Sequence, residues 1–163
     1  MIPKLPLLRR ALILVAVGTI AVGTTACQPK PAAAPAPTPA AAPTGSESAQ
    51  LISLVNAYRA ANGLAGLSEA ADATAKAQQH SIEMAANTQL YHSGSLTYGI
   101  QDGWTALGEN VGVGGSVSQL ESMFQASGPH NANLLNGAYN QIGVGVARGA
   151  DGQLYVTQFF VGR

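Results

Sequence analysis

The chain has 163 residues, enough for one domain and too few for two of ordinary size. Eight Lys and Arg residues balance eight Asp and Glu residues, and the lack of a basic surplus excludes a typical nucleic-acid-binding protein. A hydrophobic content of 47% excludes a chain that is disordered throughout, and a single cysteine excludes a framework of disulfides within the monomer.

Residues 1–26 have the pattern of a bacterial export signal. Basic residues at the N-terminus precede an apolar run over 11–22, which is short for a membrane-spanning helix. Small residues then lead to Cys27, an order that resembles a lipoprotein signal, in which the cysteine receives lipid and becomes the mature N-terminus. A signal peptide cut after Ala26 without lipidation, or an uncleaved anchor, is the alternative. The segment holds three basic residues and no acid, so the exported part is mildly acidic.

Residues 27–45 have the composition of a tether. Six of the 17 residues from Gln28 to Thr44 are proline and seven are alanine. This composition favours extended polyproline II, which rises about 3.1 Å per residue and would reach roughly 50 Å. Proline is nearly absent afterwards, so we place the domain boundary near residue 46 and expect 46–163 to carry the function.

Three helices are predicted in this domain from apolar residues at helical spacing. The first covers 46–63, the second 68–87, and the third, capped by Ser116, extends through Gln125. Their predicted inner faces comprise Leu51, Ile52, Val55, Tyr58, Ala70, Ala73, Ala77, His80, Met84, Leu120, Met123 and Phe124.

Alternating apolar residues predict an extended segment over 109–113 and a C-terminal hairpin. The two hairpin strands cover 142–146 and 154–161, and the turn is the run 149–152. Helices interleaved with strands and closed by an antiparallel pair predict an α+β fold. We expect a three-layer α-β-α sandwich with a small antiparallel sheet.

Three polar side chains stand near the expected ends of these elements, where functional groups are often presented. His92 follows the second helix, Glu109 opens the extended segment, and His130 lies just past the third helix. By composition alone this arrangement is weak support for a site, because most polar residues in turns are simply solvated.

Four other residues are assigned structural roles. His80 lies on the inner face of the second helix, so we predict a hydrogen-bonded core histidine. Trp104 lies in a loop and is predicted to plug the hydrophobic core, with a place in a cleft wall as the alternative. Arg59 and Asn62 are predicted to lie on the surface of the first helix or to tie loops together.

Five short motifs follow one another along the domain. They are Val55-Asn56-Ala57-Tyr58-Arg59, Tyr91-His92, Gly108-Glu109-Asn110, Phe124 six residues before His130, and Ile142-Gly143-Val144-Gly145. In this order they resemble the CAP superfamily, which comprises cysteine-rich secretory proteins, antigen 5 and pathogenesis-related group 1 proteins and is also called the SCP domain. The bacterial branch is the more similar one.

This resemblance implies a central cleft and its residues. The family fold is an α-β-α sandwich whose cleft is lined in many members by two histidines and two glutamates. By motif, His92 and His130 match the histidines and Glu109 matches one glutamate. Ser127 stands at the position of the second glutamate, and Glu121, about one helical turn away, is not expected to replace it.

The two matched histidines suggest a metal site. Two neutral imidazoles, from His92 and His130, would suit zinc, and Glu109 could orient one of them or act as a base for bound water. The resemblance adds that some family members bind a divalent metal through these histidines. The alternative, which we favour, is a polar network that holds loops together and binds no metal.

A serine hydrolase is a further alternative. Ser127 lies three residues before His130, and Glu109 could complete a triad. The sequence has no nucleophile-elbow motif, and Ser127 more simply ends a helix. An enzymatic function is therefore the less favoured expectation.

These observations leave three classes of function open. A binding module for a lipid, a sterol or a cell-wall component fits an exported domain of low charge, and the family includes lipid-binding members. A hydrolase would use the histidine and glutamate set, whereas a structural envelope module needs only the fold. We expect the protein to be anchored through Cys27 to the outer face of the bacterial membrane, or to be secreted.

Overall fold

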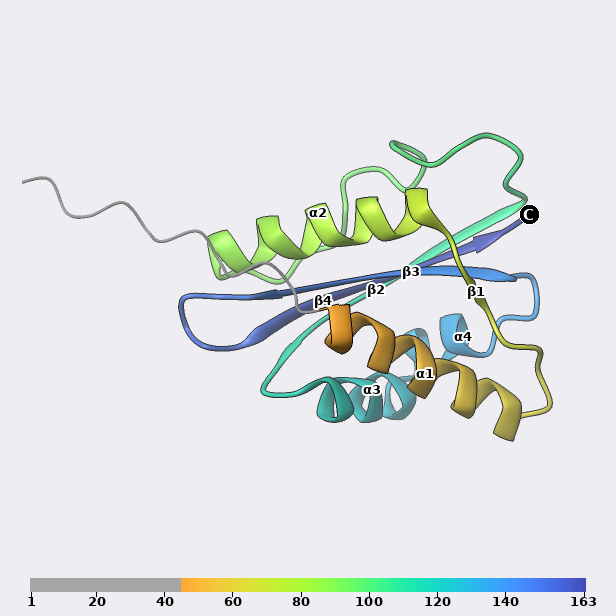
Figure 1. Ribbon diagram of the computed structural model, residues 1–163, viewed down its shortest axis with the longest axis horizontal. Coiled ribbons are helices and arrows are strands. Elements are labelled where there is room, and N and C mark those ends of the chain that lie inside the picture. The colour runs from red at the N-terminus through yellow and green to blue at the C-terminus, as the bar shows by residue number, and fades with distance from the viewer. Residues whose placement is uncertain (1–44) are drawn as a thin grey trace, which may run out of the picture. The chain divides into compact units, whose positions relative to one another are not determined.

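A sheet of four strands separates one helix from three others (Figure 1). The computed structural model describes residues 45–163, and the predicted export signal, Cys27 and the tether up to residue 44 lie outside the described residues. The elements in chain order are α1 (Gly45–Ala61), β1 (Ser68–Glu69), α2 (Ala71–Asn87), β2 (Ala106–Gly114), α3 (Val117–Ala126), α4 (Gly128–Leu134), β3 (Gln141–Arg148) and β4 (Leu154–Gly162).

The strand order in the sheet is β1-β3-β4-β2. Strands β3 and β4 pair antiparallel, as expected for the closing hairpin. Strand β2 pairs antiparallel with the other edge of β4, and the short β1 pairs parallel with β3. Helix α2 covers one face, and α1, α3 and α4 cover the other (Figure 1). The predicted α+β fold, a three-layer α-β-α sandwich, is confirmed, and the parallel β1 is an addition that the pattern did not predict.

The face under α2 is packed through small residues. A Cβ atom added to Gly143 would lie 2.1 Å from the backbone of Ala73, and one added to Gly145 would lie 2.2 Å from the carbonyl oxygen of Ala77. Glycine in the strand and alanine in the helix therefore let the two backbones approach closely. The alternation of Ile142, Val144 and Val146 with small residues follows from this contact.

The opposite face is packed through large side chains. The residues that share this layer of the core include Leu51, Val55, Leu120, Phe124, Leu134, Ile142, Val144, Val146, Leu154, Val156 and Phe160. Both faces of β4 are buried, so its strand is apolar on nearly every position rather than on alternate ones.

Two predicted features of the helices need correction. The second helix begins at Ala71 rather than Ser68, because Ser68 belongs to β1 and pairs there with Gln141 of β3. Met123, predicted on an inner face, is 49% exposed. His130 lies just past the third helix as predicted, but the residues there form a further short helix, α4, whose start is set by proline in the first turn. The cap at Ser116 is confirmed, since its side chain accepts from the backbone N–H of Gln119.

The structural roles assigned to isolated residues are partly confirmed. Arg59 is buried rather than on the surface, and it ties loops by donating to the carbonyl oxygens of Ala65, Leu134, Asn136 and Tyr139. Asn62 is exposed at the end of α1. Trp104 is 39% exposed, so the prediction of a buried plug is wrong.

Within residues 45–163, no helix is both long enough and apolar enough to cross a bilayer.

Candidate functional site

Glu109 is a buried carboxylate on the edge strand β2. Its side chain is 2% exposed. Oε1 accepts hydrogen bonds from Nδ1 of His92 at 2.8 Å and from the backbone N–H of Ser93 at 2.9 Å, and Oε2 accepts from the Ser93 hydroxyl. The carboxylate thus fixes the start of the loop that follows α2.

These contacts keep Glu109 ionised. Burial raises the pKa of Glu109, but the hydrogen bonds from Ser93 and His92 outweigh burial and leave the pKa below its ordinary value. The carboxylate next to Nδ1 makes that nitrogen the donor, so Nε2 of His92 is left as the outward-facing nitrogen. The His92 side chain is 61% exposed and can meet a ligand.

His130 is held from the other side by α3 and α4. Its Nδ1 lies 3.0 Å from the Ser127 hydroxyl, and its ring packs edge-on against Phe124 with centroids 5.1 Å apart. Burial lowers the pKa of His130, and the nearby charge of His92 lowers it further. His130 is therefore a neutral imidazole at neutral pH, close enough to His92 for their charges to interact.

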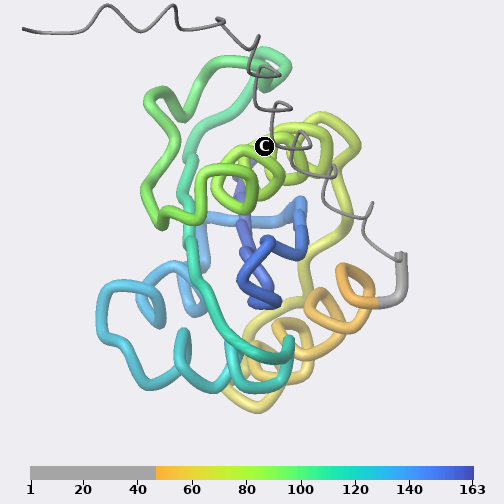
Figure 2. Tube along the Cα trace, turned by 90° about the vertical axis from the view of Figure 1, so that its left-hand side faces the viewer, coloured from red at the N-terminus to blue at the C-terminus, as the bar shows by residue number. Residues whose placement is uncertain are grey.

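The two histidine regions meet at the edge of the sheet. Figure 2 shows the loop after α2 (green) and the α3–α4 segment (pale blue) on the same side of the molecule, with β2 running between them. The resemblance predicted that His92, Glu109, Ser127 and His130 share one site. In the structure they form two hydrogen-bonded pairs, His92 with Glu109 and His130 with Ser127, on either side of one strand.

The donor set suits at most a weak metal site. Among residues 45–163, no group of three or more His, Cys, Asp or Glu side chains is arranged to hold a metal ion. Because Glu109 and Ser127 engage the two Nδ1 atoms, the nitrogens on offer are Nε2 of His92 and Nε2 of His130. Catalytic zinc normally has three protein ligands, so two imidazoles would leave the ion to complete its shell with water.

The serine-hydrolase triad is not assembled in this geometry. Ser127 and His130 are within hydrogen-bonding distance, as a nucleophile and base should be. The acid of the proposed triad, however, has its oxygens engaged by His92 and Ser93. Glu109 therefore orients His92, and within residues 45–163 it makes no hydrogen bond to His130.

An apolar groove opens beside His130, and we call it the His130 groove. Its volume is about 290 Å³. It is lined by Leu90, Val111, Gly112, Val113, Leu120, Met123, Phe124, Ser127 and His130. Leu90 and Met123 are both about half exposed at its rim, whereas Phe124 and Leu120 are buried. Ser127 and His130 are the groove's only residues with polar side chains.

A buried polar network holds α4 in place behind the groove. Nε2 of Gln158 donates to Glu121 at 2.8 Å, Nδ2 of Asn110 donates to Gln158 at 3.0 Å, and Nδ2 of Asn133 donates to Asn110 at 2.9 Å. Asn110 also donates to the backbone carbonyl of His130. Four elements are joined in this way, so the position of His130 depends on side chains well below the surface.

Sequence reasoning missed several of these contacts. Ser93 directly follows His92 and could have been noticed as a polar neighbour, but nothing in the sequence shows that it binds Glu109. Glu121, which was not expected to replace the second glutamate, is buried and accepts hydrogen bonds from Gln158 and Gln125. Gln158 connects Glu121 to Asn110 but lies 37 residues further along the chain than Glu121, so no local sequence pattern predicts this contact.

Comparisons with known proteins agree with this architecture. The model of the cysteine-rich secretory protein family, CAP, matches residues 52–161. A comparison with curated proteins finds no match.

Three bacterial structures are similar to the chain. An outer surface protein from Borrelia burgdorferi has a TM-score of 0.65 at 17% identity, covering 74% of this chain and 96% of its own. An extracellular protein containing an SCP domain from Bacillus anthracis has a TM-score of 0.61 at 27% identity, covering 72% and 41%. A cysteine-rich secretory protein from Staphylococcus aureus has a TM-score of 0.61 at 21% identity, covering 72% and 39%. The chain thus spans about two fifths of the last two proteins.

Proposed function

The chain belongs to the cysteine-rich secretory protein (CAP) family, whose model matches residues 52–161. On this premise we propose that it is an exported envelope protein that binds a small apolar ligand in the His130 groove. The single observation that carries the proposal is the groove itself, an open cavity of about 290 Å³ with a predominantly apolar lining. Its volume is near the lower end of the range for small-molecule sites.

The rim of the groove supports this proposal. Met123 is 49% exposed although it lies on a helix whose neighbouring residues Leu120 and Phe124 are buried. An apolar ligand that covered Met123 and Leu90 would remove this surface from water, which stabilises a complex by about 25 cal/mol for each Å² buried. Burial of such rim residues is the expected driving force for binding.

The polar end of the groove sets the orientation of the ligand. The lowered pKa of His130 keeps its imidazole neutral near pH 7. The ring can therefore form a hydrogen bond with a hydroxyl group of the ligand without the cost of desolvating a full charge. In the described part of the chain, no lysine or arginine lines the groove, so an anionic head group would find no basic partner there. We therefore propose a neutral amphiphile, with its apolar chain along Phe124 and Met123 and its hydroxyl toward His130.

Calorimetry with n-octanol tests this function. We expect binding with a Kd of roughly 0.1–1 mM, because a short chain and one hydroxyl supply only about 4–6 kcal/mol. Met123→Glu places a charge at the rim and should weaken binding by about tenfold or more. His130→Ala should weaken it less, since it removes one polar contact.

The matched control is Ile82→Glu. Ile82 is a similarly exposed apolar residue on α2, and it does not line the groove. This variant should bind n-octanol as the wild type does. Equal affinity in the Met123→Glu and wild-type proteins, or no binding by either, would show that the groove is not the ligand site.

We also propose that the protein is held at the membrane through Cys27, which lies outside the described residues. The support is the position of this only cysteine after a small-residue stretch and before the Pro/Ala-rich segment. Cys27→Ser should release the protein from the membrane fraction or block its processing. If the variant is processed and retained like the parent, the lipoprotein assignment is wrong.

A further inference from the structure

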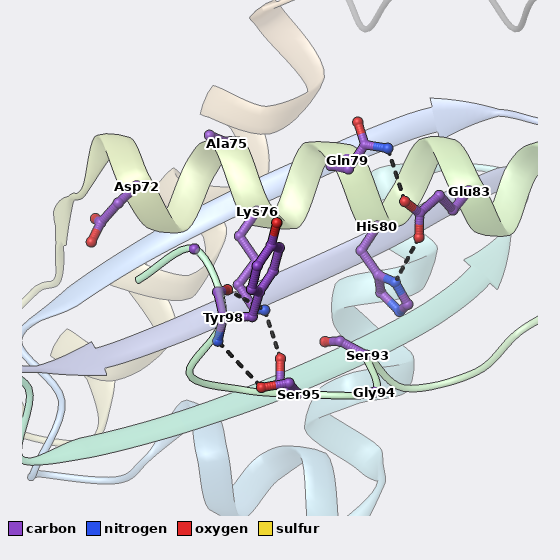
Figure 3. A pocket seen from close by; sticks show the side chains of 11 residues that line it. Asp72, Ala75, Lys76, Gln79, His80, Glu83, Ser93, Gly94, Ser95 and Tyr98 are labelled. Carbon is purple, nitrogen blue, oxygen red and sulfur yellow. Dashed lines mark hydrogen bonds and ion pairs between the residues drawn. The ribbon is translucent and has the colours of Figure 1, made fainter. Parts of the chain in front are cut away.

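A second pocket lies between α2 and the loop that follows His92, and we call it the Tyr98 pocket. Its volume is about 460 Å³. One wall is a face of α2 that includes Ala75, Gln79 and Glu83, and the other is the loop, with Ser95 and Tyr98 (Figure 3). No residue lines both this pocket and the His130 groove, so the two cavities are separate.

The loop wall is fixed to the helix by hydrogen bonds to its backbone. Nζ of Lys76 donates to the carbonyl oxygens of Ser95 at 2.7 Å and Tyr98 at 2.8 Å. Asp72, one turn earlier on α2, accepts from the backbone N–H of Gln101 at 2.9 Å. Because these bonds engage backbone atoms, the loop is ordered before any ligand arrives, and binding there costs little further conformational entropy.

Among residues 45–163, Tyr98 is the most exposed of the large apolar and aromatic side chains. It is 83% exposed, and it lines the pocket together with Lys76, whose side chain donates to the Tyr98 carbonyl oxygen (Figure 3). A rigid backbone that holds a broad ring in solvent offers a flat apolar surface for stacking, at the low entropy cost of a side chain with two rotatable angles. The aliphatic stem of Lys76 and the methyl group of Ala75 extend this surface into the pocket.

The α2 wall supplies hydrogen-bond acceptors. Nε2 of Gln79 donates to Oε1 of Glu83 at 2.8 Å, and both side chains line the pocket beside His80, so α2 brings an amide and a carboxylate to this wall (Figure 3). Glu83 is half exposed and lies 4.0 Å from Nδ1 of His80. The oxygens of such amide and carboxylate groups accept hydrogen bonds, and hydroxyl groups of a neutral ligand can donate them.

A flat apolar ring beside a row of acceptors is complementary to a sugar ring. A pyranose has an apolar face of C–H groups and a rim of hydroxyl donors. An organic cation fits less well, because the ammonium group of Lys76 lies between Tyr98 and the α2 wall. An alkyl chain would leave the oxygens of Gln79 and Glu83 buried without partners. We propose that the Tyr98 pocket binds a neutral pyranose sugar, stacked on Tyr98 and hydrogen-bonded to Gln79 and Glu83. This inference is independent of the ligand of the His130 groove.

The experiment is saturation-transfer NMR and affinity titration with three neutral disaccharides, N,N′-diacetylchitobiose, maltose and cellobiose, at up to about 10 mM. At least one should bind the full chain, with saturation strongest on the C–H face of one ring. Tyr98→Ala should weaken binding by about tenfold, because the stacked surface is lost, and Tyr98→Phe should retain most of the affinity. Glu83→Ala should weaken it by about threefold or more.

Two matched variants keep the result interpretable. Trp104→Ala removes another exposed aromatic ring from the same loop that does not line the pocket, and it should leave sugar affinity unchanged. His130→Ala should also leave it unchanged, which separates this site from the groove. The backbone bonds that Tyr98 makes survive its truncation, so Tyr98→Ala is expected to fold. If none of the three sugars binds, or if Tyr98→Ala binds as tightly as Trp104→Ala, the proposal is overturned.

Discussion

Glu109 and Glu121 are both buried acids, on opposite faces of one sheet, yet their pKa values move in opposite directions. Burial raises both pKa values, but Glu109 receives hydrogen bonds from a backbone N–H, a hydroxyl and an imidazole, and its pKa ends below the ordinary value. Glu121 receives hydrogen bonds only from the amides of Gln125 and Gln158, and burial keeps its pKa raised. The number and strength of donors, rather than depth alone, decides which buried carboxylate stays ionised.

The two faces of the sheet also differ in how the helices pack on them. Under α2 the contacts are between glycine and alanine, so the layers are close and leave no room for an added atom. Under α3 the contacts are between large side chains, and a groove remains where Phe124 and Met123 reach the edge strand. The ligand groove therefore belongs to the side-chain-packed face.

The largest effect is expected from a cavity on that face. Phe124→Ala removes a buried ring that packs on Gly112 and His130, and we expect a loss of about 3–5 kcal/mol in the free energy of unfolding. Met123→Ala, on the same helix but half exposed, should cost less than about 1 kcal/mol. Denaturant unfolding measures both. A loss below about half a kcal/mol for Phe124→Ala would place its ring on the surface.

On the α2 face the opposite change should be damaging. Gly145→Ala adds one methyl group 2.2 Å from the carbonyl oxygen of Ala77, which forces the helix away from the sheet. We expect a loss of about 2–3 kcal/mol in stability. Gly137→Ala adds a methyl group with no atom within 4 Å and should be nearly neutral. Similar stability of the two variants would mean that α2 does not pack directly on the strand backbone.

The two buried acids should give opposite pH dependences. The stabilisation from Glu109 is full above the ordinary glutamate pKa and is lost as pH falls through its lowered value, so the cost of Glu109→Gln should grow as the pH rises from about 3 to 7. The stabilisation from Glu121 is full below the ordinary pKa and is lost as pH rises through its raised value. The cost of Glu121→Gln should therefore shrink over the same range.

Chemical denaturation of the wild type and both variants across this pH range measures the two slopes. The titration of His130 is present in all three proteins, so it largely cancels in the differences. Slopes of the same sign for the two variants would show that donor number does not explain the opposite pKa shifts.

The smallest effect is expected for zinc. Two imidazoles should bind it no more tightly than a Kd of about 10 µM, and the affinity should fall as the solution becomes acidic, because both rings must be neutral to bind zinc. Either His92→Ala or His130→Ala should abolish this binding almost as completely as the double variant, while Glu109→Gln should weaken it less. Calorimetry decides the matter. Equal zinc affinity in the wild type and the double variant would remove His92 and His130 as ligands.

Much of the fold could be predicted because local patterns and packing agree. The spacing of Leu51 and Val55, the cap at Ser116 and the alternation in the closing hairpin each place an element within a few residues of its observed position. Met123 is exposed although helical spacing predicts it on the inner face of α3. The spacing shows which face of a helix is apolar but not where the buried part of that face ends, and on α3 it ends at the groove. The start of α2 was misplaced because Ser68 is held by a pairing partner 73 residues away.

The candidate site was predicted only in part. The resemblance identified His92, Glu109 and His130 but not how they pair. Pairing depends on the loop after α2, where Ser93 rather than His130 completes the shell of Glu109. No sequence pattern points to Tyr98, because its proposed role depends on its exposure and on a loop that Lys76 holds in place. Contacts between distant segments decide these features, and periodicity does not report them.

The central claim is that the groove beside His130 takes a small apolar ligand, and methyl NMR tests it most directly. On titration with n-octanol, the methyl resonances of Leu90, Val111, Val113, Leu120 and Met123 should shift together, with one saturation curve. The methyl resonances of Ala75, in the Tyr98 pocket, and of Ile82, on the exposed face of α2, should stay in place. Shifts centred on Ala75 or Ile82, or no coherent shifts among the groove methyl groups, would contradict the account.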